Sequence, residues 1–217
     1  MFDSLYPPKG EIDLIFCLEA TMSAGHYRDE IKNYVVDIVS NVCVRAEELE
    51  KPIKEINVEL ILFRSGKTDA EPFERIFVGD VFGSSDLAVL RGILDSIEYT
   101  GGCNGKVSGY EAFEMAMKSP TLYKEFEPCS RQAIFIVAES DFLPCDREEE
   151  ILELWENGGE GAPRLDIKHS MLFAMLPSSV DITDMCIVRK CLIMQCDTEK
   201  GYTAIEPDHI ADFIVSF

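Results

Sequence analysis

The stretch IDLIFCLEATMS, residues 12–23, begins with a short apolar run and ends in a polar loop. A continuous apolar run of this length is typical of a strand that is buried on both faces of a parallel sheet. Four later runs have the same character, and they cover residues 58–63, 133–138, 171–176 and 191–195. The sequence therefore predicts five buried strands, the first of which is residues 12–18.

The segments between these runs carry helical periodicity. Between the first two runs, apolar residues recur at helical spacing and predict one long amphipathic helix that ends near Pro52: Ile31, Tyr34, Val35, Ile38, Val42 and Leu49. Similar patterns predict helices around Leu90, Ala112, Ile151 and Ile210. Residues 75–82 follow a polar loop and predict a shorter strand, suited to an antiparallel edge position.

Strands that alternate with helices predict an α/β fold. We expect a doubly wound, mostly parallel central sheet with one antiparallel edge strand and helices on both faces. Residues 1–217 contain no low-complexity linker or internal repeat, so we expect a single domain in which residues 1–10 form an N-terminal extension. Ligand sites in such folds lie at the carboxyl ends of the strands.

The chain is strongly acidic. It has 20 Lys and Arg residues against 40 Asp and Glu residues, which gives a formal net charge of -20. This charge repels phosphate backbones and anionic membrane surfaces, so we expect neither a nucleic-acid partner nor a membrane partner. A basic protein surface or a cation is the compatible partner, although an acidic exterior can also serve solubility alone.

Cysteine spacing and the N-terminal residues bear on cellular location. None of the eight cysteines forms a C-x-x-C pair, and Cys17 and Cys191 lie within apolar runs, where a thiol behaves as a small buried hydrophobe. The sequence has no recognisable export signal and no apolar run long enough to span a bilayer. We therefore expect reduced thiols and a cytoplasmic protein.

The loop after the first predicted strand resembles a known family motif. Glu19, Thr21 and Ser23 follow the pattern D-x-T-x-S of the von Willebrand factor A (VWA) family, except that Glu stands where the family has Asp. Residues 138–140 are similar to the Thr-Asp-Gly that ends a later strand of the family, and here Glu139 again replaces Asp. Residues 101–104 resemble its Gly-rich third loop. The resemblance extends over roughly residues 10–217 and is that of a bacterial-type, stand-alone member.

The resemblance implies an altered metal-ion-dependent adhesion site (MIDAS). The family's site holds Mg²⁺ or another divalent cation with hard oxygen ligands, and the matching residues are Glu19, Thr21, Ser23, Cys103 and Glu139. If the third loop is longer, Ser108 takes the position of Cys103. The competing interpretation is structural, with Glu19 bonded to free backbone N–H groups and the two hydroxyls capping the long helix.

The resemblance also implies a function in protein binding, with or without a cation. The predicted partner surface comprises Glu19, Thr21, Ser23, Arg64, Cys103, Asn104, Glu139 and Asp141. The alternative is a small metal-dependent hydrolase or phosphoryl-transfer enzyme, in which Glu19, Glu139 and Asp141 hold a catalytic ion. A subunit that stabilises a larger assembly through a helix face is a third hypothesis. We expect no catalysis, because no His lies near these loops to act as a general base.

Overall fold

A six-stranded sheet forms the centre of the protein. The computed structural model describes residues 10–49, 53–102, 105–119, 131–157, 170–180, 182, 191–195 and 206–216. The strand order is β3-β2-β1-β5-β7-β8, and only β3 is antiparallel to its neighbour. The strands are β1 (Gly10–Glu19), β2 (Ile53–Phe63), β3 (Phe73–Asp80), β5 (Arg131–Val137), β7 (Ser170–Leu176) and β8 (Cys191–Gln195).

The sheet confirms the predicted fold class and all five predicted strands, and the first four of these apolar runs are buried. The antiparallel edge strand is also present, but β3 begins and ends two residues earlier than the predicted 75–82. Phe73 pairs with Phe63 at the last position of β2, so pairing resumes as soon as the connecting loop allows. This pairing across the sheet sets the bounds of β3.

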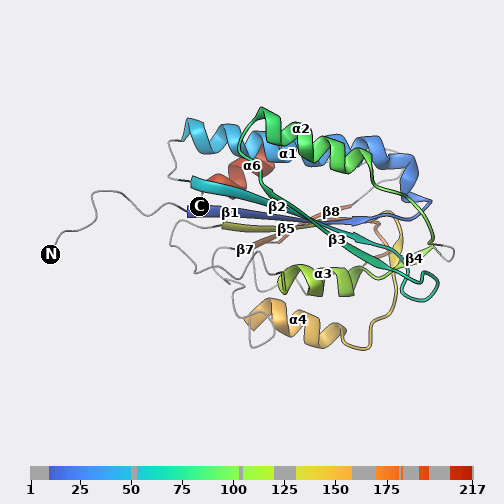
Figure 1. Ribbon diagram of the computed structural model, residues 1–217. Coiled ribbons are helices and arrows are strands. Elements are labelled where there is room, and N and C mark those ends of the chain that lie inside the picture. Colours follow the sequence, from blue (N-terminus) through green and yellow to red (C-terminus); the bar gives the residue numbers. More distant parts are fainter. Residues whose placement is uncertain are drawn as a thin grey trace.

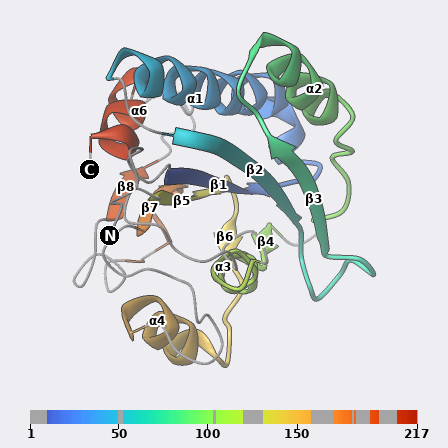
Figure 2. The ribbon, with the colours of Figure 1, turned by 60° about the vertical axis from the view of Figure 1, so that its left-hand side comes forward.

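Helices cover both faces of the sheet. In Figures 1 and 2, α1 (Arg28–Glu48), α2 (Ser84–Asp95) and α6 (Pro207–Val215) lie on one face, and α3 (Gly109–Met117) and α4 (Glu148–Asn157) lie on the other. A short 3-10 helix, η1 (Ala24–Tyr27), leads from the loop after β1 into α1. Among the described residues, no helix combines the length and apolarity needed to cross a membrane.

Alternation along the strands divides the core between the two faces. In β1, Leu14 and Phe16 join the cluster beneath α1 and α6, whereas Ile15 and Cys17 join the cluster beneath α3 and α4. This follows from the two-residue period of strand side chains. Three rings at matched register positions stack across β1, β5 and β7: Phe16 and Phe135 have centroids 4.4 Å apart, and those of Phe135 and Phe173 are 4.8 Å apart.

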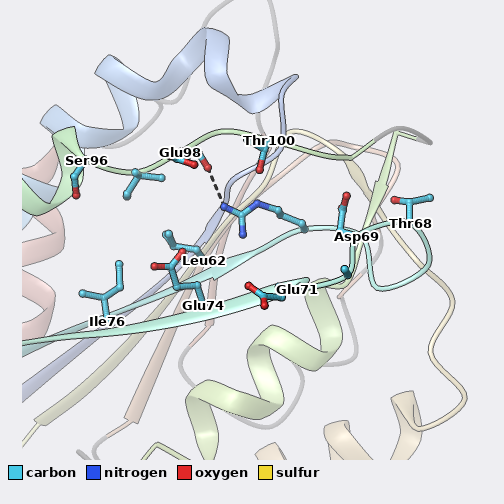
Figure 3. A pocket seen from close by; sticks show the side chains of 12 residues that line it. Leu62, Thr68, Asp69, Glu71, Glu74, Ile76, Ser96, Glu98 and Thr100 are labelled. Atoms are coloured by element: carbon cyan, nitrogen blue, oxygen red, sulfur yellow. Dashed lines mark hydrogen bonds between the residues drawn. The ribbon is translucent and has the colours of Figure 1, made fainter.

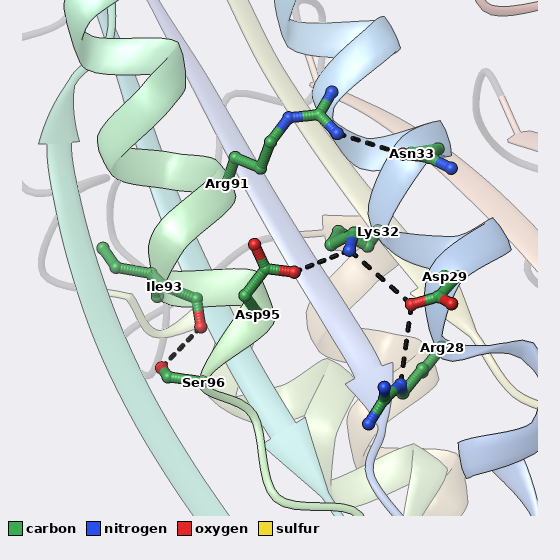
Figure 4. Close-up of polar contacts among 8 residues, drawn as sticks. All are labelled: Arg28, Asp29, Lys32, Asn33, Arg91, Ile93, Asp95 and Ser96. Carbon is green, nitrogen blue, oxygen red and sulfur yellow. Dashed lines mark hydrogen bonds and ion pairs between the residues drawn. The ribbon is translucent and has the colours of Figure 1, made fainter.

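Polar contacts join α1 to α2 at the surface (Figure 4). Lys32 Nζ lies 2.6 Å from Asp95 Oδ1, and Arg91 donates a 3.2 Å hydrogen bond to Asn33 Oδ1. Exposed contacts of this kind add little to stability, because water competes for both partners. The buried leucines of α2, Leu90 and Leu94, fix this helix against the sheet instead.

The strand order reverses between β1 and β5. From β1 the chain proceeds to β2 on one side of the sheet, while β5, β7 and β8 follow on the other side. The loops leaving β1 and β5 therefore diverge, and the gap between them is where open α/β sheets place ligands. A second, two-stranded parallel sheet of β4 (Lys106–Val107) and β6 (Asp141–Phe142) lies at the same end.

Candidate functional site

Glu19 ends β1 at this switch point and lies under the surface, with 1% of its area exposed. Its Oε2 accepts the backbone N–H groups of Glu139 at 2.8 Å and Ser140 at 2.9 Å. Its Oε1 accepts the Ser140 hydroxyl at 2.6 Å and also the Thr21 hydroxyl. One carboxylate therefore joins the loop after β1 to the loop after β5.

Thr21 and Ser23 extend the polar contacts of Glu19 toward the surface. We call Glu19, Thr21, Ser23, Glu139 and Ser140 the strand-end cluster. Thr21 is fully buried, and its Oγ1 lies 3.0 Å from Ser23 Oγ and accepts the Ala24 N–H at 3.4 Å. The exposed Ser23 occupies the N-cap position of η1, but its side chain makes no capping hydrogen bond. The prediction that the two hydroxyls cap the long helix is wrong. The N-cap residue of α1 is Tyr27, which makes no side-chain capping hydrogen bond among the described residues, and Thr21 instead accepts the N–H of Ala24, the first residue of η1.

The Glu139 carboxylate is a second acid of the same cluster. Its Oε2 atom is buried, and it has no hydrogen-bond partner among the described residues. Burial raises the pKa of Glu139, the neighbouring Glu19 carboxylate raises it further, and His26 acts in the opposite direction. A His therefore does lie near these loops, contrary to the expectation from the sequence. Both acids that the sequence singled out therefore meet at one place, as predicted for the carboxyl ends of β1 and β5.

The third loop approaches the cluster through two glycines. Gly101 and Gly102 have φ values of 72° and 77°, and a Cβ added to Gly102 would lie 2.5 Å from Thr21 Cβ. Cys103 and Asn104 lie outside the described residues. Ser108, the alternative ligand position, accepts the Gly66 N–H at 3.1 Å through its Oγ. Its hydroxyl is thus used by the loop after β2.

Arg64 follows β2 and is 8% exposed, so it lies mostly beneath the predicted partner surface. Its Nε donates to Ala20 O at 3.2 Å, and one of its terminal nitrogens donates to Glu98 O at 2.9 Å. The Ala20 carbonyl also accepts the Thr100 N–H at 3.0 Å. Arg64 therefore holds the loop after β1 against the loop after α2.

A groove of about 620 Å³ opens beside Arg64, between the β2–β3 hairpin and the segment after α2 (Figure 3). Four carboxylates line it together with the Arg64 guanidinium: Asp69, Glu71, Glu74 and Glu98. Asp69 Oδ2 accepts the N–H groups of Ser65 at 3.0 Å and Gly102 at 3.2 Å. In the described part of the chain, the carboxylates of Glu71, Glu74 and Glu98 take part in no hydrogen bond or ion pair, so they remain available to a partner.

Asp141 makes no hydrogen bond to the strand-end cluster in the described part of the chain. It begins β6, and its carboxylate accepts the Ser179 hydroxyl from the loop after β7. The three carboxylates of the alternative enzyme hypothesis therefore have different surroundings: Glu19 is saturated with donors, Asp141 accepts the Ser179 hydroxyl, and Glu139 has a buried oxygen without a donor among the described residues.

Sequence reasoning missed two contributors to this end of the protein. Ser140 supplies two of the four hydrogen bonds to Glu19, and Asp69 connects the loop after β2 to Gly102. Ser140 stands where the family has a glycine. A hydroxyl at this position, at the end of the strand beside Glu19, was a signal in the sequence that could have predicted a hydrogen bond to that acid. Asp69 lies in an ordinary polar loop, where an acid carries no specific signal.

The mostly parallel sheet with one antiparallel edge strand and helices on both faces is a fold of the von Willebrand factor A type. The chain matches no known family profile and no curated protein sequence. It is similar to the structure of proximal thread matrix protein 1 (PTMP1) from the mussel byssus, at 11% identity and a TM-score of 0.58 over 95% of this chain and 46% of that one.

A second PTMP1 structure, described with a zinc-occupied MIDAS motif, has 12% identity and a TM-score of 0.53 over 95% of this chain and 45% of that one. The chain thus spans less than half the length of these structures. At such identities the likeness shows the fold alone, and it does not support the expectation of a bacterial stand-alone member.

The cluster does not fit a metal ion in the arrangement observed. A carboxylate has about four lone-pair positions, and the four donors around Glu19 use them. The Thr21 hydroxyl directs its hydrogen at Glu19. Glu139 Oε2 is a buried oxygen without a partner in the described part of the chain, and it alone does not make a site. Among the same residues, no group of three acidic, His or Cys side chains is arranged to hold a metal.

Proposed function

We propose that the chain is a protein-interaction module whose partner binds the loops at the carboxyl ends of the strands and extends into the acidic groove beside them. The observation that carries this proposal is the groove itself, which lies next to the strand-end cluster and presents the unpaired carboxylates of Glu71, Glu74 and Glu98. A partner with Lys or Arg side chains supplies the missing charges. Arg64 connects the two regions through Ala20 and Glu98.

The overall charge supports the same class of partner. A net charge of -20 attracts a basic surface over a distance and accelerates the encounter. Once the partner is docked, the groove provides shape as well as charge, because its walls come from β3 and from the segment after α2. Glu19 and Thr21 are buried, so their role is to hold the loops in place while Ser23 and the groove residues face the partner.

The similar structures support a binding role more than a catalytic one. Both are structures of a matrix protein, and one of them is described with a zinc-occupied MIDAS motif. An enzyme with a catalytic ion would require strand-end carboxylates that are free to coordinate it, whereas Glu19 and Asp141 accept hydrogen bonds within the chain. We further propose that the chain acts as one domain and works in the cytoplasm.

Charge reversal in the groove tests this proposal. The immobilised chain is used to capture proteins from its source cell, and the wild type is compared with Glu71→Lys/Glu74→Lys. The matched control is Glu149→Lys/Glu153→Lys on α4, which changes the charge equally at exposed positions on the other face of the sheet (Figure 2). We expect the captured partner to bind the groove variant at least about tenfold more weakly and the control as well as wild type.

Two results would contradict the proposal. One is undiminished capture by the groove variant, and the other is an equal loss in the α4 control, which would indicate a general effect of net charge. Thermal unfolding of both variants verifies that each is folded. Repeating the capture with a chelator present reports separately whether the interaction needs an ion.

A further inference from the structure

We propose that the Glu19 carboxylate takes the place of the cation of the adhesion site and links the loops after β1 and β5 permanently. The proposal concerns the same face as the proposed function and deepens it, since it makes partner binding independent of a metal. It follows from the geometry around one buried side chain. It is tested without any partner, so the two proposals can fail separately.

The carboxylate of Glu19 joins two segments that lie far apart in the sequence. Glu19 accepts two backbone N–H groups, at residues 139 and 140, and two hydroxyls, at residues 21 and 140. A bound cation in such a site would connect the same loops through their oxygens. Here the connection runs directly from a carboxylate to N–H and O–H donors, and 1% exposure shields it from water.

The length of the side chain explains why this is feasible. The Glu side chain is longer than that of Asp by one methylene, which moves the carboxylate about 1.5 Å farther from the backbone. An Asp at position 19 would stop short of the Glu139 and Ser140 N–H groups and leave a gap that suits a small ion. Glu19 closes that gap by reaching both N–H groups, so the lengthened acid itself occupies the place that an ion would take.

The hydroxyls are arranged to match the carboxylate. Thr21 and Ser140 both point their hydrogens at Glu19, and the Thr21 oxygen accepts the Ala24 N–H as well. A cation would need free lone pairs on these oxygens. At Thr21 the Oγ1 atom already lies 3.0 Å from Ser23 Oγ and accepts the Ala24 N–H, and the Glu19 oxygens are occupied by four donors, so an ion would have to displace contacts that the cluster already makes.

Thermal unfolding of the complete chain tests the proposal. The wild type is measured with a chelator, with Mg²⁺ and with Mn²⁺ at millimolar concentrations, and titration calorimetry with the same two ions measures binding directly. We expect no binding heat and no shift in Tm. Mg²⁺ and Mn²⁺ are chosen because they prefer oxygen ligands and bind thiols weakly.

Two variants at position 19 test the geometry. We expect Glu19→Asp to lower Tm by about 5 °C, because its carboxylate no longer reaches residues 139 and 140. Glu19→Gln keeps the length and one acceptor oxygen, so its loss should be smaller, and it serves if the Asp variant does not fold. The proposal is overturned if Glu19→Asp is as stable as wild type, or if Mg²⁺ or Mn²⁺ stabilises the wild type and Thr21→Val abolishes that effect.

Discussion

Two buried carboxylates in this protein are stabilised in different ways. Glu19, at the end of β1, is surrounded by backbone N–H and hydroxyl donors, and none of these donors carries a positive charge. Glu59, within β2, is fully buried, and its Oε1 lies 2.9 Å from Arg75 Nε in an ion pair, while Ser119 donates to its Oε2. The first carboxylate joins two loops, and the second joins β2 to β3 and to the segment that follows α3.

The difference follows from what each location offers. A strand end faces loops whose N–H groups are not used by the sheet, so a carboxylate there can be satisfied by neutral dipoles. The middle of a strand offers no such donors, because the ladder uses them, and the charge of Glu59 needs a cation instead. Arg75 comes from the adjacent β3 and also donates to Met115 O of α3 at 2.7 Å.

Removing the cation at Glu59 should cause the largest loss of stability. We expect Arg75→Met to lower the free energy of unfolding by about 3 kcal/mol, because it leaves a buried carboxylate without its opposite charge. The double variant Glu59→Gln/Arg75→Met should recover most of this loss. Denaturant titrations measure both, and Arg91→Met on the surface of α2 is the control, with a change within about 0.5 kcal/mol.

This comparison would fail if the single and double variants were equally unstable. Such a result would mean that Arg75 acts through its contact with Met115 or through packing, and not through the charge of Glu59. Glu59 and Glu19 would then differ in where they lie in the fold, but not in whether a positive charge stabilises them.

A second prediction concerns the loop that supports the Glu19 cluster. We expect Gly102→Ala to cost about 2 kcal/mol, because the left-handed backbone disfavours a side chain and the new methyl group would collide with Thr21. Gly105 is a matched control in the same loop: its φ is 63°, and among the described residues nothing lies within 4 Å of an added Cβ. Gly105→Ala should cost only the backbone term, about 1 kcal/mol.

Denaturant titration of the two glycine variants separates packing from backbone strain. Equal losses would indicate that contact between Gly102 and Thr21 is unimportant to the cluster. A larger loss for Gly102→Ala would show that the loop of Gly101 and Gly102 supports the strand-end cluster. The ion pair of Glu59 lies between two strands instead.

The sequence predicted the fold better than the site. Apolar runs such as residues 133–138 identify strands because burial on both faces leaves few other ways to place such segments. The convergence of Glu19 and Glu139 was also predictable, since parallel strands end at one edge. The donors that surround Glu19 were not predictable. Whether Glu19 meets an ion or the N–H groups of residues 139 and 140 depends on a reach of one methylene, and on loop conformations that sequence patterns do not fix.

The smallest predicted effect concerns the charge of Glu139, which lies against the Glu19 cluster. Burial and the Glu19 carboxylate raise the pKa of Glu139 in the folded protein, so the folded state holds its proton more tightly than the unfolded state. Ionised Glu139 therefore destabilises the fold above this raised pKa, and the penalty disappears as pH falls below the ordinary Glu value. We expect Glu139→Gln to stabilise the protein at neutral pH by about 0.3 kcal/mol after solvent screening.

That gain should vanish in acid, where Glu139 is protonated in both states, and unfolding curves at several pH values measure it. The control is Glu149→Gln, which removes an exposed acid from the first turn of α4 and should not reproduce this pH dependence. A loss of stability at neutral pH would instead mean that Glu139 makes a favourable contact in its ionised form. Since its buried Oε2 has no partner among the described residues, the repeat of this measurement with Mg²⁺ shows whether a cation is that contact.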